Sequence, residues 1–230
     1  MQHVIETGAQ GTTQQSTEPE EQTGTPSDAR SILVVHSASG HSGKTTICRS
    51  LVRDLPFDAY IKLSRHSLHL ATRSLAAGTL PSEGGDTGRL SQSERSSWLR
   101  PLRDIILLDG PHQETEDAVA LTIRQWPVDT RVLIEGNCSS VPDRSRSMYV
   151  LRCPLLQSAK TNMTIMAARA DLLVVNRFPG CTEPEEAALL AILRDWNPRA
   201  TEVSGSVEDT TFIETVEAAV LNVLPLLRST

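Results

Sequence analysis

One stretch near the amino end, Ser31 to Asp54, constrains the fold more than any other part of the sequence. It begins with the apolar run Ile32 to Val35, continues with a loop of small residues, and then places apolar residues at helical spacing from Lys44 onward. An unbroken apolar run of this length is typical of a strand that is buried on both faces. The stretch therefore predicts a strand, a tight loop and a helix in succession, which is the setting of a phosphate-binding loop.

The loop itself, Ala38 to Thr45 (ASGHSGKT), contains the residue types that bind phosphate. Glycines let the main chain curl so that its N–H groups face phosphate oxygens, at the positive end of the following helix. In such a loop Lys44 reaches the outer phosphates, and the Thr45 hydroxyl helps to hold Mg²⁺. Ala38 stands where glycine usually starts the pattern, and alanine fits there if its φ is negative. We predict that a nucleotide binds to Ser39, Gly40, His41, Ser42, Gly43, Lys44, Thr45 and Thr46.

Apolar runs and helical stretches alternate along the rest of the chain. Such alternation gives parallel strands with helices on both faces, and ligands bind at the carboxyl ends of the strands. We therefore predict an α/β fold, a three-layer, doubly wound and mostly parallel sheet of the P-loop NTPase type. The expected strands after the first are 57–63, 104–109, 131–135, 147–152, 171–176 and 200–204.

Two segments stand apart from this alternation. Residues 1–29 are polar, so burial cannot offset the entropy of ordering them, and we expect a disordered tail. Residues 64–100 are rich in Ser, Gly and Arg, with an amphipathic piece near their start, and long insertions of this kind often form a substrate lid or a partner surface. The nucleotide-binding domain then spans 30–230 with a 64–100 insertion or lid, and Asp86 in that insertion is a candidate site residue.

A phosphate-binding loop also needs a carboxylate at the end of a neighbouring buried strand, to hold Mg²⁺ or its waters. Asp109 in ILLDGP and Glu135 in VLIEGN both follow an apolar run and precede glycine. Periodicity alone does not choose between them, and either carboxylate could instead cap the next element.

Charge and cysteine usage exclude several classes of protein. The net charge of −6 argues against broad nucleic-acid binding. The chain contains no apolar run long enough to span a membrane and no signal-peptide pattern, so we expect a cytoplasmic protein. The cysteines are far apart and form no C-x-x-C pair, which favours reduced thiols over a disulfide framework or a zinc site. They are Cys48, Cys138, Cys153 and Cys181.

Four segments together resemble a known family: SGHSGKTT (39–46), YIKLSRH (60–66), GGDTGRL (84–90) and VLIEGN (132–137). They are similar to the small nucleotide-binding proteins of molybdopterin-guanine dinucleotide biosynthesis (MobB-like). That family belongs to the SIMIBI class of P-loop NTPases, with the metallochaperone GTPases of urease and hydrogenase maturation and with dethiobiotin synthetase. The resemblance implies Glu135 rather than Asp109 on the metal side, and it implies that Lys62, His66 and Asp86 lie near the phosphates.

A further segment, ADLLVVNRFPG (170–180), resembles the base-reading segment of the same class, which usually reads Asn-Lys-x-Asp. The resemblance implies that the Asn176 side-chain amide bonds the purine. Arg177 replaces the lysine and Pro179 replaces the aspartate, whose carboxylate normally selects guanine. The sequence therefore leaves ATP and GTP open as the ligand.

These observations lead to one main hypothesis and two alternatives. The main hypothesis is a Mg²⁺-dependent accessory protein that binds and hydrolyses a nucleoside triphosphate during cofactor assembly, with the molybdenum cofactor favoured and Lys44, Asp86 and Glu135 as catalytic residues. Its expected partners are a cofactor-biosynthesis protein and, from the resemblance, a second copy of the chain. The alternatives are a P-loop small-molecule kinase or ligase and a non-catalytic, nucleotide-switched adaptor.

Overall fold

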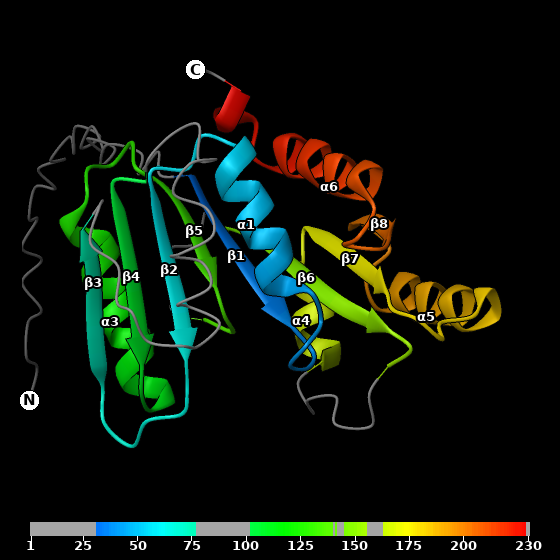
Figure 1. The fold of residues 1–230 in the computed structure, drawn as a ribbon, viewed down its shortest axis with the longest axis horizontal. Helices are drawn as coiled ribbons and strands as arrows, with labels where there is room; N and C mark the ends of the chain where they lie inside the picture. Colours follow the sequence, from blue (N-terminus) through cyan, green and yellow to red (C-terminus); the bar gives the residue numbers. More distant parts are fainter. Residues whose placement is uncertain (1–30, 77–101, 140, 142–144, 156–162, 229–230) are drawn as a thin grey trace, which may run out of the picture.

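The computed structural model describes residues 31–76, 102–139, 141, 145–155 and 163–228 (Figure 1). The expected tail and most of the 64–100 insertion, including Asp86, lie outside these ranges. The elements in chain order are β1 (Ser31–Ser37), α1 (Lys44–Asp54), β2 (Ala59–Ser64), β3 (Ala71–Ala76), β4 (Asp104–Asp109), α3 (His112–Gln125), β5 (Arg131–Glu135), β6 (Arg146–Cys153), α4 (Met163–Arg169), β7 (Leu172–Arg177), α5 (Glu183–Trp196), β8 (Thr201–Gly205), α6 (Thr210–Val223) and the short 3₁₀ helix η1 (Pro225–Arg228).

The strands form one sheet in the order β3-β4-β2-β5-β1-β6-β7-β8. Every pairing is parallel except that between β3 and β4. All seven residues of β1 are buried, as expected for a central strand with helices on both faces. The carboxyl ends of β1, β2 and β5 meet at one edge, because Val35 pairs with Glu135 and Glu135 pairs with Lys62. The predicted fold class, a doubly wound and mostly parallel α/β sheet, is confirmed.

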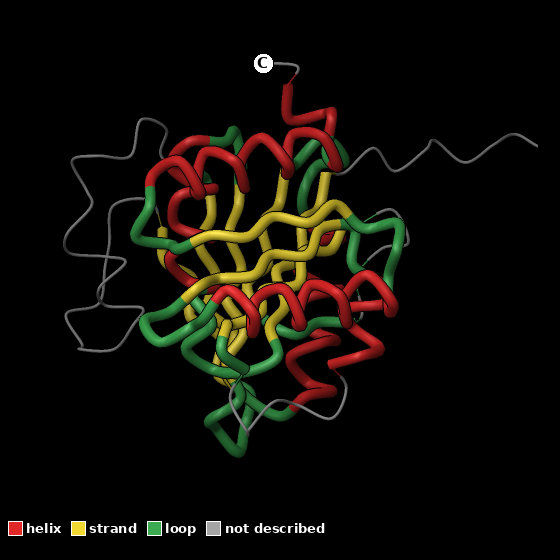
Figure 2. The backbone as a smooth tube through the Cα atoms, turned by 90° about the vertical axis from the view of Figure 1, so that its right-hand side faces the viewer, coloured by secondary structure: helices red, strands yellow, loops and turns green. Residues whose placement is uncertain are grey.

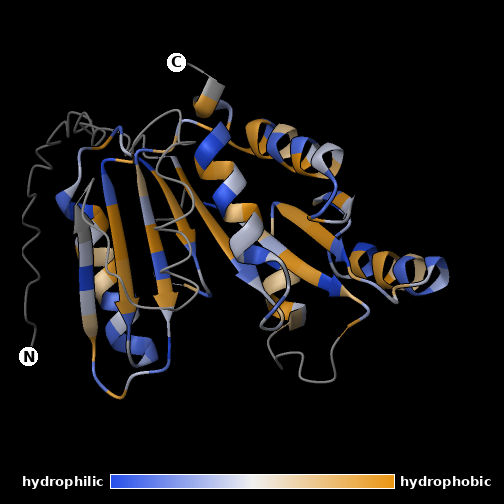
Figure 3. Ribbon diagram, viewed as in Figure 1, coloured by the Kyte–Doolittle hydropathy of each residue, from blue (hydrophilic) through white to orange (hydrophobic). Residues whose placement is uncertain are grey.

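The core consists of apolar layers on the two faces of the sheet. Successive residues of β1 point to opposite faces: Leu33 and Val35 pack with α1 and α6, while Ile32 and Val34 pack with α3. Farther along the sheet, α4 and α5 cover β6 and β7. Figure 2 shows helices on both sides of the sheet, and Figure 3 shows apolar residues concentrated in the strands between them. None of the helices in the described ranges has the length and apolar character needed to cross a membrane.

Two expected elements differ from the structure near the 64–100 insertion. The second strand begins at Ala59, because Phe57 turns into the core beside α1 instead of joining the sheet. The amphipathic piece expected in the insertion is partly the strand β3, which runs antiparallel to β4 at the edge of the sheet. This strand satisfies backbone groups of β4 that would otherwise face solvent, so part of the insertion belongs to the sheet itself.

The prediction that all four cysteines are reduced thiols is wrong. Cys153, at the end of β6, forms a disulfide with Cys181, in the loop that precedes α5, while Cys48 and Cys138 are free and buried. The bonded cysteines are 28 positions apart in the sequence and gave no local signal, but β6 and β7 are adjacent parallel strands. Their adjacency brings the end of one strand beside the loop after the other.

Candidate functional site

The loop between β1 and α1 has the backbone shape that a phosphate cradle requires. His41 has a φ of 54° and Gly43 a φ of 87°, and Gly43 caps the amino end of α1. His41 is the only non-glycine residue with positive φ in the described ranges, so Ala38 does not adopt the conformation that would demand glycine. The Ala38 side chain is buried with Tyr149 and Leu151. Alanine at the first position of the pattern is therefore compatible with the loop.

Two asparagine side chains hold this loop from opposite sides of β1. Asn176, at the end of β7, donates from Nδ2 to the Ser42 carbonyl (3.0 Å) and accepts at Oδ1 from the Val207 amide (3.0 Å). Asn137, just after β5, accepts at Oδ1 from the Ser37 amide (3.1 Å) and donates from Nδ2 to the Ser37 carbonyl (3.4 Å). Sequence patterns did not identify Asn137 as a site residue, although it follows directly after Glu135 and Gly136 at the end of β5.

Glu135 lies at the amino end of α1, beside the two loop residues with predicted phosphate and metal roles. Its Oε1 accepts a hydrogen bond from Thr45 Oγ1 at 2.5 Å and lies 3.5 Å from Lys44 Nζ. Lys62 Nζ, from the adjacent strand, is 3.7 Å from the same oxygen, and the buried Tyr60 hydroxyl donates to Oε2. The structure thus brings Lys44, Thr45, Lys62 and Glu135 together.

The ionisation of Glu135 follows from these neighbours. Burial alone would raise the pKa of this carboxyl, but the charges of Lys44 and Lys62 and the hydrogen bonds from Thr45 and Tyr60 lower the pKa below its usual value. Burial and the adjacent carboxylate raise the pKa of Tyr60, which keeps its hydroxyl a donor. A hydroxyl and an ionised carboxylate in contact are hard oxygen donors of the kind Mg²⁺ prefers, so Thr45 and Glu135 fit this ion.

Asp109, the competing carboxylate, is engaged elsewhere. It accepts hydrogen bonds from the His66 amide (2.8 Å) and from Ser67 Oγ (2.7 Å), so it shapes the turn after β2. The Ser67 hydrogen bond is the main reason that the pKa of Asp109 falls to about 2. Asp109 is not on the wall of the cavity beside the phosphate loop, whereas Glu135 is. In the described ranges no three His, Cys, Asp or Glu residues are grouped as a metal site.

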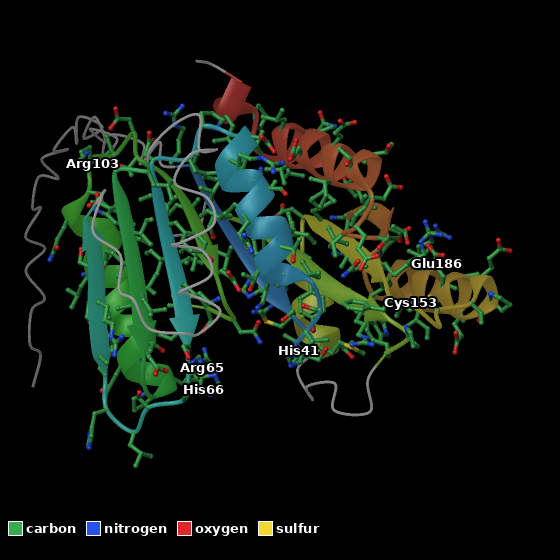
Figure 4. The ribbon with its side chains drawn as sticks, viewed as in Figure 1. His41, Arg65, His66, Arg103, Cys153 and Glu186 are labelled. Carbon is green, nitrogen blue, oxygen red and sulfur yellow. A yellow bond between two sulfur atoms is a disulfide. The ribbon has the colours of Figure 1, made fainter. Side chains whose placement is uncertain are left out.

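A cavity of about 730 Å³ opens over the loop. Its wall carries more positive than negative charge: Lys44, Arg49, Lys62 and Arg65 face it, with Glu135 as the one carboxylate among its lining residues. Figure 4 shows His41, Arg65 and His66 at the same edge of the sheet. Such a wall suits a polyphosphate. The lining residues are Ser37, 40–46, Arg49, 62–66 and 135–137, so the candidates Ser39 and Asn176 are not on this wall.

His36, in β1 just before the loop, makes the stability of the fold depend on pH. It is buried and its Nδ1 has no hydrogen-bond partner among the described residues. Burial lowers the pKa of His36 from 6.5 to about 4. The negative charge of Glu116 raises this pKa, and the positive charge of Lys44 lowers it further. Between these pH values the unfolded chain binds a proton that the folded chain does not, so stability falls as the pH falls.

We expect the wild type to lose about 2 kcal/mol of unfolding free energy through His36 between about pH 7.5 and about pH 5. A His36→Leu variant lacks this titration and should lose correspondingly less over the same interval. Urea unfolding of both proteins at the two pH values measures the difference. Equal losses in the two proteins would contradict the assignment to His36.

Comparison with known proteins supports the fold. No family model matches the chain, and no curated protein matches it. Among solved structures, the hydrogenase maturation factor HypB from Archaeoglobus fulgidus matches with a TM-score of 0.55 and 14% identity, over 86% of this chain and 91% of that one. HypB from Helicobacter pylori, in complex with nickel, matches with a TM-score of 0.47 and 15% identity, over 85% and 87% of the two chains. At 14% identity, the similarity to the A. fulgidus protein shows the fold and nothing further.

Proposed function

We propose that this chain is a Mg²⁺-dependent nucleoside triphosphatase. The observation that carries the proposal is the contact of Lys44, Thr45 and Glu135 at the amino end of α1, under a cavity with a positive wall. Thr45 and Glu135 would hold Mg²⁺, which neutralises charge on the terminal phosphates when bound. Among the described residues, no other place brings together a tightly turned loop, a lysine, and a hydroxyl in contact with a carboxylate.

The roles of the individual residues follow from their chemistry. The amides of the loop, aided by the helix amino end, bind the phosphate oxygens. Lys44 stabilises the charge that develops between the two outer phosphates, and Lys62 supplies a second positive charge nearby. Glu135 or Asp86 would orient the attacking water, and His66 lies on the cavity wall within the same group of residues.

We propose that hydrolysis serves the assembly of a metal cofactor. The segments that resemble MobB-like proteins support the molybdenum cofactor as the finer assignment, with a cofactor-biosynthesis protein as partner and a homodimer as the working form. The A. fulgidus protein with the same fold is a hydrogenase maturation factor, which is an accessory role of the same general kind. The expected location is the cytoplasm.

The base would lie beside β7 and β8. Asn176 is fully buried and its amide already bonds Ser42 and Val207, so any contact with the purine would be made from a fixed position. Arg177 follows in place of the usual lysine and forms an ion pair with Glu186 at 3.6 Å. Since this arrangement lacks the aspartate that selects guanine, comparing the ATP and GTP affinities with Mg²⁺ present determines the preference.

The proposal is tested by replacing Lys44. We expect Lys44→Ala to weaken the binding of the preferred triphosphate by at least about tenfold, because one positive charge on the phosphates is lost. Arg53→Ala, at the opposite end of the same helix, is the matched control and should bind as the wild type does. Calorimetric titration gives both affinities, and undiminished binding by Lys44→Ala would refute the proposed site.

Turnover assays on the wild type distinguish the function classes. Phosphate release with water as the only acceptor supports the hydrolase. Loss of nucleotide only when an acceptor is added would support a kinase or ligase instead. Tight binding without either reaction would indicate a nucleotide-switched adaptor.

A further inference from the structure

Arg65 is a positively charged residue beside the phosphate loop. It follows β2 directly and lines the same cavity as the phosphate loop. Its Nη2 donates a hydrogen bond to the Asn137 carbonyl, and the Asn137 side chain in turn holds Ser37, where the loop begins. The guanidinium is therefore tied to the residues that follow β5, and these in turn bond the end of β1, where the loop begins. Figure 4 shows Arg65 at the lower end of β2, at the edge of the sheet where His41 lies.

The buried carboxylate of Glu116 forms an ion pair with Arg65. Glu116, on α3, is 2% exposed, and its Oε1 lies 3.6 Å from Arg65 Nη2. The same carboxylate accepts from the Ser139 amide (2.9 and 3.0 Å) and from Ser139 Oγ (3.2 Å), and His112 Nδ1 is 3.4 Å from Oε1. Burying a carboxylate is costly unless charges and hydrogen bonds compensate it. Arg65, whose side chain is 38% exposed, is thus anchored at its Nη2 beside the cavity.

The order of the strands gives the direction in which a bound triphosphate points. β5 and β2 lie on one side of β1, and β6, β7 and β8 lie on the other. Thr45 and Glu135 would hold Mg²⁺ on the β5 side, where the ion would neutralise charge on the outer phosphates, and Lys62 in β2 adds a positive charge 3.7 Å from Glu135. The terminal phosphate would therefore lie on the side of the loop toward β2, the strand that Arg65 follows.

Arg65 retains donors for such a phosphate. Both contacts of its guanidinium with the described residues use Nη2, which leaves Nη1 and Nε for oxygens in the cavity. A guanidinium keeps its charge at all relevant pH values and matches two phosphate oxygens with its planar fork.

We propose that Arg65 is a catalytic residue that contacts the terminal phosphate of the bound triphosphate, and that Glu116 is the residue that positions it. This inference rests on the proposed function. The guanidinium stabilises negative charge on the terminal phosphate as the bond to the leaving diphosphate breaks and water attacks. The leaving diphosphate remains in the loop, with Lys44, and does not need Arg65.

The experiment compares a non-hydrolysable triphosphate with the diphosphate, each with Mg²⁺, on the full chain. In Arg65→Gln we expect the triphosphate affinity to fall at least about tenfold and the diphosphate affinity to change less than about threefold. Single-turnover hydrolysis should slow by about 10- to 100-fold. Arg65→Lys keeps the charge without the fork and should give intermediate values. Arg103→Gln is the matched control, because Arg103 pairs with Asp104 at the opposite end of the sheet and should behave as the wild type does (Figure 4).

Glu116 is tested by its coupling to Arg65. Glu116→Gln should weaken triphosphate binding more than diphosphate binding, and the double variant Arg65→Gln/Glu116→Gln should show the same triphosphate-to-diphosphate ratio as Arg65→Gln alone. A purely structural role of Glu116 would instead lower both affinities in parallel. The melting temperatures show whether each variant folds. If the Glu116 variants do not fold, the comparison of Arg65→Lys with Arg65→Gln still tests the role of Arg65.

The outcomes separate this inference from the proposed function. If the wild type binds neither nucleotide, the proposed function fails and the inference fails with it. If the wild type binds both and Arg65→Gln keeps the wild-type ratio of affinities, the proposed function stands and the assignment of Arg65 is overturned. If Arg65→Gln weakens both nucleotides equally, Arg65 only shapes the wall and the assignment is also overturned.

Discussion

Gly43→Ala is expected to abolish high-affinity nucleotide binding, with a loss of at least about 100-fold, or about 2.7 kcal/mol. Gly43 has a φ of 87°, and a Cβ at this position would lie 2.3 Å from Asn176 Nδ2 and 3.1 Å from a Val207 methyl. The left-handed backbone costs alanine about 1–2 kcal/mol. Displacing Asn176 also breaks its hydrogen bond to Ser42, so the loop loses both its shape and its support.

The same substitution should reduce the free energy of unfolding by about 2–4 kcal/mol. Gly40→Ala is the matched control, because Gly40 lies in the same loop, has no atom within 4 Å of an added Cβ and needs no positive φ. We expect Gly40→Ala to change stability by less than about 0.5 kcal/mol. Titration with nucleotide and urea unfolding measure both effects. Wild-type binding by Gly43→Ala would show that the loop does not need this geometry.

Glu135→Gln is expected to reduce turnover by at least about 100-fold. The amide keeps the size of the side chain and can still accept from Thr45 or Tyr60, so the loop should keep its shape. It removes the negative charge that lies 3.5 Å from Lys44 and 3.7 Å from Lys62 and that would hold Mg²⁺. The loss should therefore appear in the hydrolysis rate and in its Mg²⁺ dependence more than in the melting temperature.

Asp109→Asn provides the control for Glu135, since both carboxylates end a strand and precede a glycine. Asp109 bonds the His66 amide and Ser67 and does not itself line the cavity, so the hydrolysis rate of Asp109→Asn should stay within about threefold of the wild type. Rates of phosphate release at several Mg²⁺ concentrations compare the two variants. A greater loss in Asp109→Asn than in Glu135→Gln would reverse the metal assignment.

Most of the sheet could be predicted from the sequence because its strands are continuous apolar runs buried on both faces. The run Asp104–Asp109 and the run Arg131–Glu135 became β4 and β5 with the expected bounds. Local signals also suffice for α5, where Thr182 and Glu185 have the Thr-x-x-Glu spacing of a capping box and form one in the structure. These features depend on residues that are close in the sequence, so local sequence patterns predict them.

The features that escaped prediction depend on neighbours in space. The partner of Cys181 is 28 residues away and becomes adjacent only through the pairing of β6 with β7. Glu116 looked like an ordinary helix residue, and its burial arises because the loop after β5 packs against α3. Sequence patterns alone could not choose between Asp109 and Glu135, because both have the same local context. They differ in their spatial neighbours, because Glu135 contacts Thr45 and Lys44 on the cavity wall whereas Asp109 does not line the cavity.

The support of the phosphate loop by Asn137 and Asn176 has a kinetic consequence. Each side-chain amide bonds only protein groups, so the loop would keep its shape after the terminal phosphate leaves. A preorganised loop of this kind would continue to hold the diphosphate product, since the product retains most of the oxygens that the loop would bind. Product release, rather than bond cleavage, would then limit the steady-state rate. A pre-steady-state burst of phosphate should therefore precede slow cycling, and a protein that loosens either asparagine would act as an exchange factor.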